Sequence, residues 1–310
     1  MGKGRPAELV VGSVQLGLAY GAANRTGKPA REVALRLVRR AANAGVSTFD
    51  TARAYGEAEE RLGAALAGRR AVRAITKLAP LGDLSPDASR EAVCAAVDKS
   101  IADSCAALRR ERLDCVLLHR ASHMTDYGGA IWQRLQEHVA DGKIVALGVS
   151  VQSPAQAYAA LAEVGVTHIQ LPFNLLDWRW REAGVIAALE AHPTVTVHVR
   201  SVFLQGVLAA NDASVWPRIA GVDAPALVAW LEDTARAFRR ESAADLALAY
   251  ARGQSWVDGV VVGQETEAQL DENMRLYSRP RLPAEDCALI ECSAPRVPES
   301  LLDPAQWKPQ

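Results

Sequence analysis

Three apolar runs in this chain are each followed by polar residues whose types suit acid–base chemistry. Asp50 and Tyr55 lie in FDTARAYG, Lys77 lies in ITKL and His119 lies in VLLHR. The runs that precede them, residues 45–49, 72–76 and 113–118, are typical of buried strands. The polar residues therefore lie at the carboxyl ends of predicted strands, which is the end that carries the chemistry in a parallel barrel.

These four residues could form a proton donor and the groups that tune it. A tyrosine hydroxyl, with an ordinary pKa of about 10, is a poor acid at neutral pH, but a neighbouring lysine ammonium stabilises its phenolate. We therefore expect Lys77 to tune Tyr55, and Asp50 to hold the lysine in place and keep it charged. His119 is expected to donate to, or orient, the oxygen of a bound carbonyl. Because no amino acid supplies a hydride, a cofactor has to bring it.

Each residue alone also has a structural explanation. An Asp-Thr pair at a strand end often forms a turn or a helix cap, and a histidine after an apolar run is often a hydrogen-bonded structural residue. The joint pattern favours chemistry over these alternatives. No metal-ligand spacing occurs among the five cysteines and six histidines, so no metal site is expected.

The order of apolar and helical segments predicts an α/β fold, a (β/α)8 TIM barrel of eight parallel strands inside a ring of helices. The intervening segments are rich in alanine and have helical spacing. The expected strands are residues 9–16, 46–49, 72–76, 113–118, 144–149, 168–171, 195–199 and 257–262. The clearest expected helices are residues 31–43, 86–108, 129–140 and 154–164.

Local signals predict where helices begin and where loops lie. Ser85-Pro86 and Ser153-Pro154 each combine a capping residue with a proline that suits the first helical turn. Residues 201–225 lack sustained periodicity and predict a long loop that closes over the barrel mouth. The proline-rich residues 279–310 predict a tail that packs on the barrel, within a single domain of residues 1–310.

Composition narrows the class of protein. A chain of 310 residues with 49% hydrophobic and 23% charged residues can bury one large core. A net charge of -1 argues against nucleic acid or a membrane surface as the main partner. The cysteines form no CxxC pair, and neither a signal peptide nor a bilayer-spanning run is found. These features predict a cytoplasmic protein that acts on a small molecule.

The chain also resembles the aldo-keto reductase family, through an ordered series of motifs that runs over nearly its whole length. Besides the strings around Asp50, Lys77 and His119, the motifs are GSVQLG (12–17), AGVSTFDTARAYGEAEERLG (44–63), DGKIVALGVS (141–150), IQLPFNLLD (169–177), VRSVFLQGVL (199–208) and VVVGQETEAQLDEN (260–273). The resemblance implies that Asp50, Tyr55, Lys77 and His119 are the family's catalytic tetrad, with Tyr55 as proton donor.

The resemblance further implies an extended nicotinamide dinucleotide on the carboxyl face of the barrel, with its nicotinamide near the tetrad and its adenosine near the last strand. The absence of a GxGxxG motif after a strand argues against a Rossmann site. Gly206 and Gly263 suit close approach of a phosphate to the backbone, although glycine after a strand is also an ordinary turn residue. The cofactor-binding residues implied in this way are Ser150, Gln170, Asn174, Arg200, Ser201, Leu204, Gly206, Gly263, Glu265, Gln269 and Asn273.

Three positions depart from the family pattern. Val151 replaces an asparagine that contacts the carboxamide, and Arg200 replaces an aromatic residue that stacks on the nicotinamide, where a guanidinium plane could also stack. Glu265 follows the last predicted strand where NADPH-using relatives often carry a basic residue. A carboxylate there would repel a 2′-phosphate and could accept from a free 2′-hydroxyl, or it could be an exposed first-turn residue favoured by the helix dipole. The sequence therefore predicts NADP(H) or NAD(H) and leaves the choice open.

The sequence says less about the substrate. Aromatic and arginine side chains could surround the barrel mouth and suit a sugar-like or phosphorylated compound, although the tryptophans also suit ordinary packing at the rim. The residues considered for this role are Tyr20, Arg53, Trp178, Trp180, Trp216 and Trp307, together with Arg200. Variants such as GSVQLGLAYG and HVRSVFLQG resemble a bacterial branch linked to carbohydrate or secondary metabolism, which favours a sugar-like aldehyde or ketone.

The leading hypothesis is NAD(P)H-dependent reduction of an aldehyde or ketone to an alcohol, with the proton from Tyr55. One alternative is a cofactor-binding regulatory or scaffold protein of the same fold, which an exposed apolar surface with no carbonyl turnover would favour. Another is a redox-neutral enzyme such as an epimerase that retains its cofactor. The sequence leaves the natural substrate, the reaction direction and the oligomeric state open, because one barrel can host many chemistries.

Overall fold

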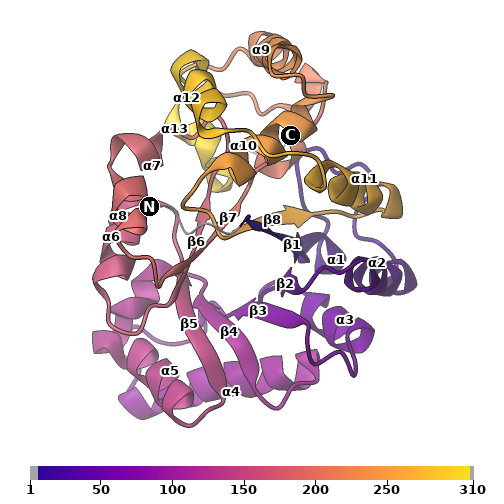
Figure 1. Ribbon diagram of the computed structural model, residues 1–310. Coiled ribbons are helices and arrows are strands. Elements are labelled where there is room, and N and C mark those ends of the chain that lie inside the picture. The colour runs from indigo at the N-terminus through magenta and orange to yellow at the C-terminus, as the bar shows by residue number, and fades with distance from the viewer. Residues whose placement is uncertain (1–5, 308–310) are drawn as a thin grey trace.

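The computed structural model describes residues 6–307 and shows the predicted (β/α)8 barrel. Eight parallel strands follow one another around a closed sheet, and the last strand pairs with the first in register, from Glu8 beside Gly259 to Gly12 beside Gly263 (Figure 1). The strands are β1 (Glu8–Gly12), β2 (Thr48–Asp50), β3 (Arg73–Lys77), β4 (Leu113–Leu118), β5 (Ile144–Ser150), β6 (His168–Pro172), β7 (Thr196–Arg200) and β8 (Gly259–Gly263).

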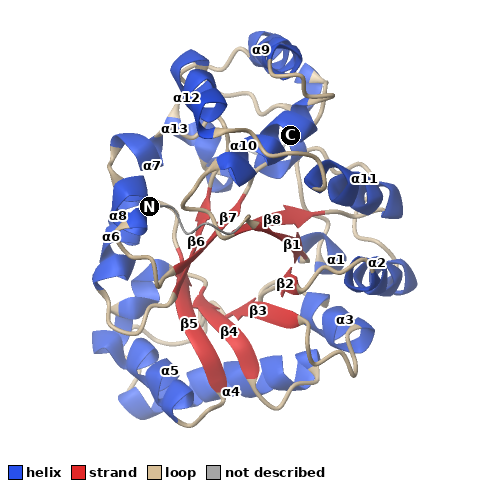
Figure 2. Cartoon of the chain, viewed as in Figure 1, coloured by secondary structure: helices blue, strands red, loops and turns tan. Residues whose placement is uncertain are grey.

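Helices surround the strands, which leaves the sheet buried from outside (Figure 2). A parallel sheet covered in this way needs apolar residues on both faces, and β6 accordingly has all five of its residues buried. The α-helices are α1 (Val14–Gly17), α2 (Arg31–Asn43), α3 (Ala58–Ala65), α4 (Arg90–Leu108), α5 (Ala130–Ala140), α6 (Pro154–Ala162), α7 (Arg179–Glu182), α8 (Val185–Glu190), α9 (Ala224–Ala237), α10 (Ala243–Gly253), α11 (Glu267–Tyr277), α12 (Ala284–Ser293) and α13 (Glu299–Leu302). Short 3₁₀ turns are η1 (Ala121–Met124), η2 (Asp126–Gly129), η3 (Leu204–Gly206), η4 (Ala213–Val215) and η5 (Pro304–Gln306).

The first strand is shorter than the apolar run at residues 9–16 predicts. β1 ends at Gly12, the Ser13 amide donates to the carbonyl oxygen of Asp50 at 2.9 Å, and the chain then makes the single helical turn α1. Gly17 ends this turn so close to the next loop that a Cβ atom would lie 1.7 Å from the Tyr55 carbonyl oxygen. The absence of a side chain at Gly17 therefore lets α1 pack against the loop that carries Tyr55.

The two predicted serine-proline helix starts differ in outcome. The hydroxyl of Ser153 accepts from the Gln156 amide, and Pro154 opens α6 as expected. Helix α4 instead begins at Arg90, where Ser89 is the residue whose hydroxyl accepts a cap bond, from the Ala92 amide at 3.3 Å. The start predicted at Ser85-Pro86 is therefore four residues early.

The proline-rich tail is more helical than its sequence suggested. Prolines at 283 and 295 flank the ten-residue helix α12, and α13 follows. The Leu282 amide donates to the Ala249 carbonyl on α10 at 3.1 Å, and the indole of Trp178 donates to the Val297 carbonyl at 3.0 Å. These contacts hold the tail against helices that follow the sixth and seventh strands. Within residues 6–307, no helix combines the length and the hydropathy that a membrane span requires.

Candidate active site

A buried ion pair lies at the carboxyl ends of β2 and β3. The ammonium Nζ of Lys77 lies 2.8 Å from each carboxylate oxygen of Asp50 and 3.0 Å from the Thr51 carbonyl oxygen, to which it also donates. Asp50 Oδ1 accepts a further hydrogen bond of 2.7 Å from Gln170 Nε2 on β6. Lys77 is only 1% exposed and Asp50 4%, so both charges are shielded from water.

The pair keeps Lys77 charged in spite of its burial. Burial alone would lower the pKa of the ammonium, but the charge of Asp50 and its hydrogen bonds outweigh this effect, and the pKa of Lys77 is raised. All three ammonium hydrogens have acceptors in Asp50 and Thr51. Nζ nevertheless lies 5.1 Å from the centroid of the Tyr55 ring, so its positive charge acts on Tyr55 through space.

His119 completes the group from the end of β4. Its ring meets the Tyr55 ring edge to face, with centroids 5.8 Å apart and an interplanar angle of 87°. Burial, followed by the positive charges of Lys77 and Arg200, lowers the pKa of His119 to about 4. The imidazole is therefore neutral at pH 7. Its Nδ1 is buried and has no hydrogen-bond partner among residues 6–307.

A cavity of about 820 Å³ opens beside these residues, with Asp50, Tyr55 and His119 in its wall. It runs past the carboxyl ends of β1, β5, β7 and β8 to the first turns of α10 and α11. Nine of the residues expected to bind a cofactor line it: Ser150, Arg200, Ser201, Leu204, Gly206, Gly263, Glu265, Gln269 and Asn273.

The other two expected cofactor residues lie behind the cavity wall. Gln170 is fully buried and donates to Asp50, and its Oε1 has no partner among the described residues. Asn174 accepts from the Leu176 amide at 3.0 Å and donates to the Ser201 carbonyl at 3.4 Å. In this structure both amides support cavity-lining residues from behind.

The loop after β7 forms one side of the cavity, where a long loop was predicted. It includes η3 and η4 and ends where α9 begins at Ala224. Gly206 has a φ of +93°, and a Cβ atom on it would lie 2.7 Å from the Ala23 Cβ, while the Ala23 amide donates to the Gln205 carbonyl at 3.2 Å. Gly263 similarly allows the Gln15 side chain to approach closely. Contacts within the chain therefore already explain why glycine stands at both positions.

Most of the aromatic residues considered for the substrate are used in packing. Tyr20 and Arg200 line the cavity. In the described part of the chain, the cavity lining does not include the other candidates, Arg53, Trp178, Trp180, Trp216 and Trp307. Trp180 is fully buried, with its indole donating to Asp177 at 3.1 Å. Arg53 instead pairs with the buried Glu59 on the outer side of the barrel. Trp178 and Trp307 donate to backbone carbonyls, and Trp216 lies in the hydrophobic core.

The structure also shows cavity-lining residues that sequence reasoning missed. Ser13 and Gln15 line the cavity from the turn after β1, and Ser13 Oγ and Gln15 Oε1 are buried without a partner among residues 6–307. Gln152 and Glu272 line it from the β5 loop and from α11. The signal for Ser13 and Gln15 was present, since both are polar residues in the GSVQLG string, but they were assigned to a strand that ends before them.

Comparison with known sequences identifies the family. The sequence model of the aldo/keto reductase family matches residues 8–294, so the chain belongs to this family. Members of the family use nicotinamide cofactors. The match includes all eight strands, and it ends at Ala294, the residue that follows α12.

Individual relatives are more distant. The chain is 33% identical over 125 residues to a 6-dehydroglucose reductase from Novosphingobium aromaticivorans, a match that covers 38% of this chain and 41% of that relative. The structure of this chain is similar to the holo form of an aldo-keto reductase from Bacillus halodurans, with a TM-score of 0.75, 22% identity and 96% of each chain covered. A thermostable aldo-keto reductase in complex with the inhibitor epalrestat gives a TM-score of 0.67 at 18% identity, with 92% and 94% of the two chains covered. At these identities the solved structures support the fold alone.

Proposed function

We propose that this protein reduces an aldehyde or ketone to an alcohol with NADH or NADPH, using Tyr55 as the proton donor. The observation that carries the proposal is the buried Lys77–Asp50 pair next to Tyr55 and His119, in the wall of one large cavity. Keeping an ion pair out of water costs free energy and is weak support for stability by itself. Its position beside an ionisable tyrosine favours a role in chemistry.

The cavity residues fit a dinucleotide. Ser13 Oγ and Gln15 Oε1 are buried in its wall with no partner among the described residues, and buried polar groups rarely stay unpaired. They could bind polar groups of a cofactor, together with Ser150, Ser201, Arg200 and Asn273, which lie on the same wall. When bound, the nicotinamide would supply the hydride that the carbonyl carbon receives.

The chain's own residues would handle the proton. Tyr55 would give its hydroxyl proton to the carbonyl oxygen, which becomes the alcohol oxygen, and would be left as a phenolate. The positive charge of Lys77 would stabilise that phenolate, and Asp50 and the Thr51 carbonyl hold the ammonium in place. His119, neutral at pH 7 because its pKa is about 4, could donate one hydrogen bond to the same oxygen and so orient it.

A sugar-like carbonyl compound is the substrate class that we propose. The relative that shares 33% identity over 125 residues carries the name 6-dehydroglucose reductase. Two polar side chains that line the cavity, Tyr20 and Gln152, could bind hydroxyl groups of such a substrate. A polar substrate would satisfy such groups better than an apolar one.

A pair of tyrosine variants tests the proposal. Tyr55→Phe removes only the hydroxyl and should lower the turnover of a reducible sugar aldehyde by about a thousandfold, within the usual range for losing a general acid. Its affinity for the reduced dinucleotide, measured by fluorescence titration, should stay within about twofold of the wild-type value. Tyr158→Phe removes a hydroxyl that lies outside the cavity, where it donates to the Ala183 carbonyl oxygen at 2.8 Å, and should keep most of the turnover.

Full turnover in Tyr55→Phe would refute the assigned proton donor. Dinucleotide binding without reduction of any compound in a broad carbonyl panel would instead favour a cofactor-binding regulatory protein. Stoichiometric cofactor that stays with the purified protein, without net oxidation during turnover, would favour a redox-neutral reaction.

A further inference from the structure

The end of the cavity at α10 and α11 carries negative charge. Glu265 and Glu272 line this end, together with Ser242 and Gln269. Arg200 is the single basic residue that lines the cavity in the described part of the chain. The charge of Arg200 acts on Lys77 and helps to lower the pKa of His119, so Arg200 belongs to the catalytic end. The other end therefore has carboxylates in its wall and no cation.

Glu265 is the carboxylate that could meet a ligand. It is 8% exposed and lines the cavity, and its Oε1 accepts a hydrogen bond of 3.0 Å from Gln269 Nε2. Its Oε2 has no hydrogen-bond partner, and no cation pairs with it, among residues 6–307. A carboxylate that is mostly buried is stable only when it is well hydrogen-bonded or paired. Glu265 thus retains one acceptor atom that a hydroxyl in the cavity could satisfy.

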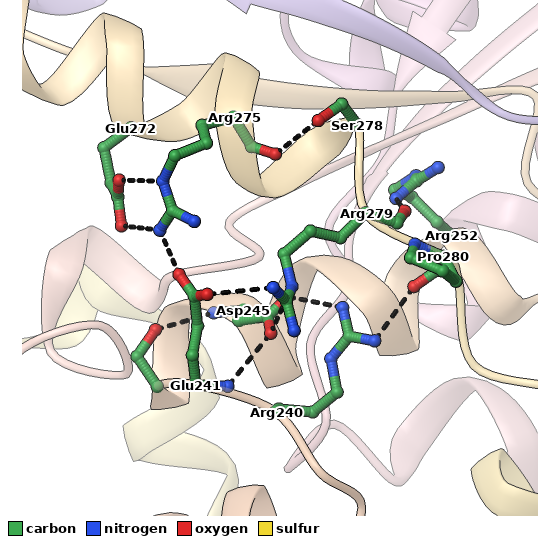
Figure 3. Close-up of polar contacts among 10 residues, drawn as sticks. Arg240, Glu241, Asp245, Arg252, Glu272, Arg275, Ser278, Arg279 and Pro280 are labelled. Atoms are coloured by element: carbon green, nitrogen blue, oxygen red, sulfur yellow. Dashed lines mark hydrogen bonds and ion pairs between the residues drawn. The ribbon is translucent and has the colours of Figure 1, made fainter.

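Arginines lie nearby, but carboxylates already bind them (Figure 3). Arg275 donates twice to Glu272, at 2.8 Å each, and also contacts Glu241. Arg279 pairs with Glu241 at 2.9 Å and with Asp245 at 3.0 Å. In the same network Arg240 binds Asp245 and the Pro280 carbonyl oxygen.

The arginines of this network already have carboxylate partners, which weakens their attraction for a phosphate. Asp245 is fully buried, and it would lose its counter-charge if Arg240 and Arg279 turned away. Removing the cation from a buried pair is strongly destabilising. The network therefore keeps its arginines and leaves Glu265 without a basic neighbour.

The start of α11 offers few donors of its own. Helix N-termini usually attract phosphates through their unpaired amides. Here Gln269 Oε1 accepts from the amides of Glu265 and Thr266, at 2.9 and 3.3 Å, and Thr266 Oγ1 accepts from the Gln269 amide at 3.2 Å. This reciprocal cap occupies the amides of Glu265, Thr266 and Gln269, and it leaves those of Glu267 and Ala268 as the donors at the start of the helix.

We propose that this end of the cavity selects the dinucleotide whose adenosine ribose has a free 2′-hydroxyl, NAD(H), and rejects the 2′-phosphate of NADP(H). Glu265 Oε2 accepts a hydrogen bond from the ribose hydroxyl, and the same oxygen repels a phosphate dianion. The inference rests on the proposed function, because it requires the catalytic end of the cavity to hold the nicotinamide.

Binding measurements on the wild-type chain test the proposal without turnover. Fluorescence titration with NADH and with NADPH should give a dissociation constant at least about tenfold lower for NADH. Two adenosine nucleotides can then compete with bound NADH. Adenosine 5′-monophosphate should displace NADH at a lower concentration than its 2′-phosphorylated form does. Equal or tighter binding of NADPH would overturn the inference and leave the proposed reductase intact. No binding of either dinucleotide would overturn both.

Two variants that each remove one negative charge then test whether Glu265 causes the preference for NADH. Glu265→Gln should bring the two dissociation constants to within about threefold of each other, mainly by tightening NADPH binding. Glu267→Gln removes the same charge two residues away, on an exposed side chain that pairs with Arg36 outside the cavity, and should leave the ratio unchanged. Equal effects of the two variants would show a general charge effect and refute the contact. Thermal unfolding of each variant shows that it is folded.

Discussion

The two ends of the barrel both carry charged residues, but the charges are used differently. At the amino end, Glu8 on β1 accepts hydrogen bonds from Arg73 on β3, at 2.7 and 2.8 Å, and from Thr48 on β2, at 3.0 Å. His198 on β7 contacts the same carboxylate at 3.5 Å. One carboxylate thus links four strands of the closed sheet, and its side chain is 27% exposed.

At the carboxyl end, the Lys77–Asp50 pair is almost fully buried and the polar groups around it are incompletely satisfied. His119 Nδ1 and Gln170 Oε1 both lack partners among the described residues. The ring nitrogens of His198 beside Glu8 also lack hydrogen-bond partners among these residues, so the two ends differ mainly in that Glu8 binds side chains of the strands, whereas the Lys77–Asp50 pair lies beside a cavity. Where hydrogen-bonding capacity is left over beside a cavity, the charge favours a role in binding or catalysis.

Removing the cation at the catalytic end should have the largest effect. Lys77→Met leaves Asp50 buried without its counter-charge and should lower the free energy of unfolding by about 3–5 kcal/mol, measured in urea. Turnover should be lost as well, because Tyr55 loses the charge beside it. The double variant Asp50→Asn/Lys77→Met should recover most of the stability and none of the turnover. A stable single variant would show that the buried pair is no more costly to break than the contacts of Glu8 at the amino end.

His119 should give a pH effect of intermediate size. Its pKa is about 4 in the folded protein against an ordinary value of 6.5, so the fold favours the neutral ring. This contribution to stability is complete above pH 6.5 and is lost as the pH falls from 6.5 towards 4. On the order of 2 kcal/mol should disappear between pH 7.5 and 4.5. His119→Gln should lose less stability over this range, and an identical loss in variant and wild type would contradict the assignment.

Glu8 at the opposite end should give the smallest effect. Burial would raise its pKa, but the His198 ring 3.5 Å away and the charge of Arg73 outweigh this and lower the pKa of Glu8 to about 2. The resulting stability is present above pH 4.5 and is lost as the pH falls from 4.5 towards 2. Solvent screening limits it to about 1 kcal/mol. Glu8→Gln should therefore be less stable at pH 7 in a urea titration, by about that amount, with unchanged turnover.

A change of turnover in Glu8→Gln would contradict the separation of the two ends. A wild-type chain that loses no more stability than Glu8→Gln between pH 4.5 and 2.5 would contradict the role given to this carboxylate.

Sequence reasoning predicted that Asp50, Tyr55, Lys77 and His119 lie together because they follow apolar runs, and the structure places them side by side at the ends of neighbouring strands. It overextended the first strand, since the apolar residues of GSVQLG look alike in a strand and in the helical turn α1. It left open whether Trp180 lines the barrel mouth or packs at the rim, and the structure shows its indole buried against Asp177. Whether a tryptophan faces a cavity or the core depends on contacts that its neighbours in sequence do not encode.

The wall of the α11 end was predictable only in part. Glu265 stood out because it directly follows the glycine after the last strand. Only the folded chain shows Arg275 and Arg279 bound to Glu241, Glu272 and Asp245. These pairs join residues up to 38 positions apart, as for Arg279 and Glu241, which local patterns do not reveal.

The pairing of β1 with β8 has a consequence for biosynthesis. The cavity takes Gly12 and Gln15 from the start of the chain and Gly263 and Asn273 from near its end. The pocket therefore cannot form until residues as far as Asn273 have left the ribosome, and a bound dinucleotide cannot stabilise the emerging chain before then. Until that moment β1 has an unpaired edge, which is open to pairing with other chains. Newly made protein thus depends on the speed of this last closure to escape aggregation.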